Sequence, residues 1–203
     1  MKILKQNQLN EAAELLKQGK VIAFPTETVY GLGVVFDDQK AYDSLCTVKR
    51  RPPEKPFTLM LADVKEVEKY ADLNNVAKAL VKEFMPGQFT LITKAKEGLP
   101  SWCVSNQGNV GIRIADYDLI RDLIRKTGKP LLVPSANRSG EKPATNTQET
   151  IDAFGEELAA IVEGESVSNI PSTIVFVGDT YSDVFREGAV KIDDIRRVVS
   201  EVK

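Results

Sequence analysis

Histidine is absent from this sequence of 203 residues. Its absence excludes sites in which a histidine activates a serine or a cysteine, and it excludes zinc sites and general bases built on imidazole. Any chemistry must therefore use carboxylates, lysines, arginines, hydroxyl groups, main-chain dipoles or a metal ion that arrives with a ligand.

Cysteine and long hydrophobic runs are scarce as well. Cys46 and Cys103 are the two cysteines, and they form no CxxC motif, so we interpret them as reduced thiols rather than as a disulfide. No apolar run approaches the ~20 residues of a membrane-spanning helix, and the first ten residues contain no apolar segment of a signal peptide. We therefore expect a cytoplasmic protein that does not contact membranes.

An excess of positive charge is missing too, since 27 lysines and arginines face 29 acidic residues and the net charge is −2. A dedicated nucleic-acid-binding domain is typically basic, so this balance argues against one while leaving room for local basic patches. The hydrophobic fraction of 42% is typical of a folded globular protein.

Helical and strand patterns alternate along the chain, which favours an α/β or α+β fold with a mixed sheet. Asn10 is predicted to cap the first helix and Gly19 to end it, Asp37 or Asp38 to start the second, and Gly128 to close a later one. Helices are expected near residues 9–20, 37–50, 63–71, 74–87, 116–129, 147–155 and 193–202, and strands near 21–25, 34–36, 57–61, 89–95, 110–115, 130–136, 158–164, 172–178 and 183–188.

The stretch PTETVYGLG, residues 25–33, is unusually polar for a segment that follows the apolar VIAF. If its backbone is extended, Thr26, Thr28 and Tyr30 point to one side and Glu27 to the other. Such a polar face suits a ligand pocket. The alternative is an ordinary strand-to-turn junction in which the two glycines supply the turn. The glycines do not form a nucleotide fingerprint, because GxGxxG lacks its third glycine here.

A basic stretch, KRRPPEKPF, follows the second expected helix and contains Lys49, Arg51 and Lys55. A run of cations at this place is often only a solvated helix end, where positive charge favourably meets the helix dipole. Two prolines restrict the chain as it leaves the helix, and cations held in this way are well placed to bind a polyanion.

Three further stretches carry more polarity than folding requires. Arg113 lies within the apolar strand GIRI, where a guanidinium needs a paired anion or a cleft, and a ligand carboxylate would serve. Ser135 and Asn137, in SANRSG, follow a strand at the end where open α/β sheets bind ligands, although a capping turn is the alternative. Ser172 opens the strand STIVF and Arg186 ends FREG; each is a weak signal alone.

Taken together and in this order, PTETVYGLG, KRRPPEKP, SANRSG, STIVF and FREG closely resemble the YrdC/TsaC family of threonylcarbamoyl-AMP synthases over most of the chain. The resemblance implies a single YrdC-like domain over residues 1–203, with a twisted mixed β-sheet flanked by helices and a concave site. It also implies a nucleotidyltransferase that condenses L-threonine, bicarbonate and ATP into threonylcarbamoyl-AMP and pyrophosphate. That product feeds the modification of adenosine 37 in tRNA by a downstream transferase complex.

The same resemblance assigns roles to individual residues. It implies threonine binding by Thr28, Arg113 and Ser172, nucleotide binding by Lys49, Arg51, Lys55, Ser135, Asn137 and Arg186, and catalysis by Lys49 and Arg51. Met60 stands where some family members carry a histidine, so the contact made there is not transferred. Mg²⁺ is expected with ATP, but no carboxylate cluster identifies its ligands, and Glu27 is a candidate by position alone.

Two other functions remain open at this point. A concave basic face could hold double-stranded RNA or tRNA without any catalysis, which the net negative charge argues against. The chain could also be a carbamoyl-transfer domain of the hydrogenase-maturation type, which shares the fold. A requirement for threonine distinguishes the synthase from both.

Overall fold

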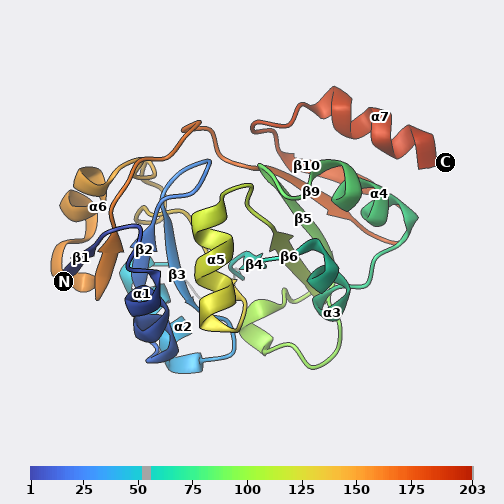
Figure 1. Cartoon of the computed structure of the whole chain (residues 1–203). Helices are drawn as coiled ribbons and strands as arrows, with labels where there is room; N and C mark the ends of the chain where they lie inside the picture. Colours follow the sequence, from blue (N-terminus) through green and yellow to red (C-terminus); the bar gives the residue numbers. More distant parts are fainter. Residues whose placement is uncertain (52–55, 203) are drawn as a thin grey trace.

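The computed structural model describes residues 1–51 and 56–202, and its strands form one mixed sheet in the order β1-β8-β2-β3-β7-β4-β6-β5-β9-β10 (Figure 1). Parallel and antiparallel neighbours alternate irregularly, as the sequence predicted for a mixed sheet. The strands are β1 (Lys2–Leu4), β2 (Ile22–Phe24), β3 (Gly31–Val35), β4 (Leu59–Met60), β5 (Phe89–Lys94), β6 (Asn109–Arg113), β7 (Leu131–Leu132), β8 (Ala160–Val162), β9 (Thr173–Val177) and β10 (Ser182–Arg186).

Helices flank the sheet and confirm the expected order of elements. They are α1 (Leu9–Lys17), α2 (Gln39–Lys49), α3 (Val67–Tyr70), α4 (Asn75–Phe84), α5 (Asp118–Thr127), α6 (Thr147–Phe154) and α7 (Ile192–Val202), with short 3-10 turns η1 (Val64–Glu66), η2 (Ser101–Cys103) and η3 (Gly155–Glu157). Asp38 caps α2 by accepting from the Ala41 amide at 3.1 Å, and Gly128 ends α5 in the left-handed conformation.

The predicted cap of α1 is wrong. The helix starts at Leu9, Gln8 occupies the cap position, and Asn10 lies inside the first turn. The Gln8 side chain accepts from the Lys5 amide at 2.9 Å and closes a turn before the helix. Because this turn places Leu9 in the core, the helix begins at Leu9, ahead of the predicted cap at Asn10. Asn10 instead accepts a hydrogen bond from Lys126 Nζ on α5 at 2.8 Å.

The two glycines of residues 31–33 lie within strand β3 and do not form a turn. The ring of Phe24, on the neighbouring strand β2, lies across them. A Cβ at Gly33 would come within 2.5 Å of Phe24 Cε1, and one at Gly31 within 3.2 Å of Phe24 Cε2. Glycine is therefore required here for close packing between strands.

One half of the sheet is covered by helices on both faces. On β2, Ile22 and Phe24 pack with α1 and α5, whereas Ala23 packs with the cluster that contains residues of α2 and α6. Figure 1 shows α1 and α5 side by side over this half. Strands β2, β3 and β8 are therefore buried along their whole length.

The other half of the sheet is covered by helices on one face. Leu91 of β5, Ile112 of β6 and Val175 of β9 are fully buried in the cluster that contains residues of α3, α4 and α7. The alternate residues, such as Ile92 and Ile174, line a cleft on the opposite face. Within residues 1–51 and 56–202, every residue that lines this cleft comes from a strand or a loop.

The structure also describes the two cysteines and the lengths of the helices. Cys46 and Cys103 are both free thiols, and burial raises the pKa of Cys103 to about 12. None of the helices in the described part of the chain is both long enough and apolar enough to cross a bilayer.

Candidate active site

The cleft has a volume of about 350 Å³ and receives residues from every polar stretch that the sequence singled out. Its lining includes Thr26, Thr28, Val29, Tyr30, Gly31, Arg51, Pro56, Phe57, Thr58, Met60, Thr90, Ile92, Ser105, Asn109, Gly111, Arg113, Val133, Pro134, Ser135, Pro143, Pro171, Ser172, Ile174 and Arg186. Three arginines from distant parts of the sequence thus meet around one hollow, beside several hydroxyl groups.

The loop of residues 25–30 enters the cleft without regular strand structure. The hydroxyls of Thr26 and Thr28 are 2.9 Å apart, and Thr26 Oγ1 donates to the Val29 carbonyl at 2.7 Å. Tyr30 behaves differently, because its phenol oxygen lies 3.0 and 2.9 Å from the carbonyls of Val162 and Gly164, and burial raises its pKa to about 12. The Tyr30 ring lines the cleft, but its hydroxyl anchors the loop to the end of β8.

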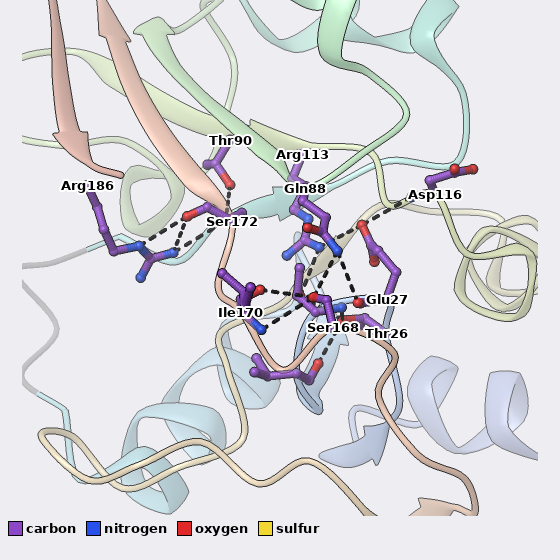
Figure 2. Close-up of polar contacts among 12 residues, drawn as sticks. Thr26, Glu27, Gln88, Thr90, Arg113, Asp116, Ser168, Ile170, Ser172 and Arg186 are labelled. Carbon is purple, nitrogen blue, oxygen red and sulfur yellow. Dashed lines mark hydrogen bonds and ion pairs between the residues drawn. The ribbon is translucent and has the colours of Figure 1, made fainter. Parts of the chain in front are cut away.

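Arg113, at the end of β6, meets the same loop inside the cleft. Its Nη2 donates to Glu27 Oε1 at 2.8 Å and to Thr28 Oγ1 at 3.0 Å (Figure 2). The Arg113 and Glu27 side chains are 9% and 8% exposed, so the ion pair is buried. A buried guanidinium requires such a partner, which explains how an arginine is tolerated in an apolar strand.

Arg51 reaches the cleft from the segment that follows α2. Its guanidinium lies over the ring of Phe57, 4.8 Å from the ring centroid, and its Nη2 donates to the Pro56 carbonyl at 3.3 Å. Burial lowers the pKa of Arg51 from its ordinary value. Stacking fixes the plane of the guanidinium and leaves donors for an anion. Lys55, predicted to bind the nucleotide, lies outside the described residues.

Arg186 reaches the cleft from the end of β10. Its Nε and Nη2 donate to the Ser172 carbonyl at 3.1 and 2.7 Å, and Ser172 Oγ lies 2.9 Å from Thr90 Oγ1 (Figure 2). Burial and the positive charge of Arg113 lower the pKa of Arg186. Sequence reasoning missed Thr90, because a threonine inside an apolar strand reads as an ordinary β-former.

Lys49 and Asn137 lie behind the wall of the cleft. Lys49 Nζ donates to the Ser135 carbonyl at 2.6 Å and to Asn137 Oδ1 at 3.1 Å, and the Ser135 hydroxyl donates to the same Oδ1 at 2.6 Å. Burial, with a contribution from Arg51, lowers the pKa of Lys49 to about 8. Ser135 itself lines the cleft, so the hydrogen bonds from Lys49 and to Asn137 hold it in position there. That Lys49 and Asn137 bind the nucleotide stays a prediction.

Glu27 is the carboxylate closest to the cleft arginines that could hold a cation. Its Oε1 accepts from Arg113 Nη2 and from the Asp116 amide, the latter at 3.2 Å, whereas its Oε2 is buried and has no hydrogen-bond partner among the described residues. Within the part of the chain that the structure describes, no three acidic or cysteine side chains gather as metal ligands. Met60 lines the cleft with a buried, apolar side chain and provides no polar contact at its position.

Sequence comparison places this chain in a known family. The Sua5/YciO/YrdC family model, described as "Telomere recombination", matches residues 14–188. A Bacillus subtilis relative named threonylcarbamoyl-AMP synthase is 33% identical over 201 residues, which cover 96% of this chain and 57% of the relative. This chain thus spans little more than half of that protein.

Structural comparison agrees. The structure of Pyrococcus abyssi Sua5 complexed with L-threonine matches with a TM-score of 0.93 and 28% identity, covering 99% of this chain and 62% of that one. The Escherichia coli YciO structure matches with a TM-score of 0.87 and 26% identity, covering 96% of this chain and 98% of that one. The predicted fold class is confirmed, and the chain belongs to the Sua5/YciO/YrdC family.

Proposed function

We propose that this member of the Sua5/YciO/YrdC family is an L-threonylcarbamoyladenylate synthase, a nucleotidyltransferase that acts on L-threonine, bicarbonate and ATP. The observation that carries the proposal is that Arg51, Arg113 and Arg186 line one cleft together with paired hydroxyl groups. The name of the Bacillus subtilis relative and the threonine complex of Pyrococcus abyssi Sua5 support it.

The amino-acid substrate would lie against the loop of residues 25–30. Arg113 would bind the threonine carboxylate, because its Nη1 has no hydrogen-bond partner among the described residues while Nη2 is held by Glu27. Thr28 and Ser172 line the same cleft and offer hydroxyl groups to the substrate. Buried polar groups that pair only with the correct substrate are an effective source of specificity.

The nucleotide would lie between Arg51 and Arg186. Among the ion pairs of the described residues, neither of these arginines has a carboxylate partner, so both can give their charge to phosphate. Lys49 and Asn137 would support this side by holding Ser135, and Lys55 is proposed to contact the phosphates as well. Charge-assisted contacts of this kind are roughly twice as strong as neutral hydrogen bonds.

The reaction needs no covalent nucleophile from the protein. The threonine amine takes up carbon dioxide from bicarbonate, with loss of water, and gives a carbamate. A carbamate oxygen attacks the α-phosphorus of ATP, and pyrophosphate leaves. Holding these anions in register lowers the barrier by up to about 7–11 kcal/mol, and a donor aimed at developing charge contributes about 3–4 kcal/mol. A chain without histidine can meet these demands.

Mg²⁺ is proposed to arrive on the phosphates of ATP, where it would neutralise charge. Glu27 Oε1 is held by Arg113, and Oε2 has no further acidic ligands gathered around it among the described residues, so we derive no step through a metal ion held by this chain. The product, a mixed anhydride, is proposed to pass in the cytoplasm to a transferase complex that modifies tRNA.

Pyrophosphate release tests the proposal. The purified protein with ATP and Mg²⁺ should release pyrophosphate only when threonine and bicarbonate are both present. Release without threonine would indicate a different adenylation or carbamoyl-transfer reaction. Absence of any release, combined with RNA binding whose log K falls by roughly 0.7 to 0.9 per phosphate contact for each unit of log salt, would instead indicate an RNA-binding module.

A further inference from the structure

Glu27 has no role in the reaction described so far, although its carboxylate is buried beside the cleft. We propose that Glu27 is the positioning residue of Arg113: it fixes the guanidinium and offsets part of its charge, so that Arg113 selects the substrate carboxylate by geometry. This inference rests on the proposed function, because it takes the ligand of Arg113 to be threonine.

The side chain of Glu27 joins two elements of the site. Its Oε1 accepts from Arg113 Nη2 at 2.8 Å and from the main-chain amide of Asp116, just beyond β6, at 3.2 Å (Figure 2). The Asp116 amide belongs to the backbone, so it holds the carboxylate in place independently of Arg113. A carboxylate fixed in this way determines where Nη2 lies, and with it the plane of the whole guanidinium.

The main chain of Glu27 is tied from the opposite side. Its carbonyl accepts from the Ser168 amide at 3.0 Å and from Gln88 Nε2 at 3.3 Å, and the same Gln88 nitrogen donates to Ser168 Oγ at 2.9 Å. The segment between β8 and β9 and the residue before β5 therefore both hold Glu27 (Figure 2). Carboxylate and backbone are thus fixed by separate elements, as a positioning role requires.

The charges of the three cleft arginines support different roles for Arg113 and for the other two. Arg113 is paired with Glu27, whereas Arg51 and Arg186 form no ion pair with the described residues. Two uncompensated charges therefore face the nucleotide, and one compensated guanidinium faces the amino acid. Arg113 Nη1 lacks a hydrogen-bond partner in the described chain, so a carboxylate can bind there without displacing Glu27.

This arrangement makes the two substrates respond differently to removal of the Glu27 charge. Glu27→Gln keeps an acceptor for Arg113 Nη2 and for the Asp116 amide, but it loses the charge that orients the guanidinium. We expect the KM for threonine to rise by about 10- to 100-fold, the range that one hydrogen bond to a charged group spans. The affinity for ATP should stay unchanged or increase a few-fold, because the cleft gains one positive charge.

The experiment is a double-mutant cycle of Glu27→Gln and Arg113→Gln, with KM for threonine and for ATP measured separately. Binding of threonine and of a non-hydrolysable ATP analogue is followed by calorimetry on the same proteins, and thermal melting checks their folding. If Glu27 acts through Arg113, its substitution has little further effect once Arg113 is changed, so the two effects do not add.

Glu157→Gln is the matched control, because Glu157 pairs with Arg138, which is 8% exposed like Arg113 but lies outside the cleft lining. Glu157→Gln should alter the thermal stability, and it should not change the KM for threonine and the KM for ATP by different factors. Equal shifts in threonine and ATP affinity for Glu27→Gln, fully additive effects in the cycle, or the same split in Glu157→Gln would overturn the inference. If wild-type protein binds no threonine at all, the proposed function fails first and the inference with it.

Discussion

The two halves of the sheet are both built from apolar strands, but helices cover two faces of one half and one face of the other. In the half around β2 and β3, helices cover both faces, and Ile22, Ala23 and Phe24 are all fully buried. In the half around β5, β6 and β9, helices cover one face, and alternate residues such as Thr90 and Arg113 line the cleft. The candidate site therefore lies where the second layer of helices ends.

The largest effect should come from the doubly covered half. Phe24→Ala removes a fully buried ring that packs across Gly31 and Gly33, and we expect it to lower the free energy of unfolding by about 3–5 kcal/mol. Urea denaturation measures this, and the fraction that remains folded should keep a wild-type KM for threonine. A stability loss below about 1 kcal/mol would mean that this half does not carry the core.

The cleft should show the reverse behaviour. Arg51→Ala removes a guanidinium whose polar contact with the described residues is a single carbonyl, so the thermal midpoint should change little. We expect kcat/KM for pyrophosphate release to fall by about 10²–10³, the range for one donor aimed at developing charge. Arg51→Lys, which retains charge without the planar fork, should recover only part of the activity. Full activity in Arg51→Ala would show that Arg51 does not contact the nucleotide during the reaction.

Lys49, the last residue of α2, should make stability depend on pH. Its pKa in the folded protein is about 8, below the ordinary 10.5, so between these values the unfolded chain binds more protons and stability rises with pH. Relative to Lys49→Met, the wild type should gain about 1.6 kcal/mol in free energy of unfolding between pH 8 and 9.5. Denaturation at the two pH values measures the gain, and parallel curves for the two proteins would contradict it.

The smallest effect is expected for Thr90. Thr90→Val keeps the shape and the strand preference but removes the hydroxyl that lies 2.9 Å from Ser172 Oγ. Loss of one neutral hydrogen bond corresponds to about 0.5–1.5 kcal/mol, or a 2- to 13-fold rise in KM for threonine. Steady-state kinetics measures it, with Thr93→Val, on the opposite face of β5, as the control. A change in KM for ATP alone would place Thr90 on the nucleotide side.

Most of the fold could be predicted from the sequence because the periodicity of apolar residues, and helix caps such as Asp38 and Gly128, indicate the individual elements. The cap of α1 could not, because tertiary burial of Leu9 decided it. The convergence of Arg51, Arg113 and Arg186 followed from the family resemblance, and no local pattern contains it.

The partners of the polar groups were the part that escaped sequence reasoning. The Tyr30 hydroxyl anchors a loop instead of facing the cleft, and Lys49 is buried against Ser135 and Asn137. Each of these contacts joins residues far apart in the chain, and only the folded structure brings them within hydrogen-bond distance.

A crystal structure with L-threonine and a non-hydrolysable ATP analogue tests the central claim most directly. The threonine carboxylate should lie on Arg113 Nη1 with Glu27 still bound to Nη2, and the phosphates should lie between Arg51 and Arg186. A nucleotide bound outside this cleft, or a threonine carboxylate that contacts no atom of Arg113, would contradict the claim.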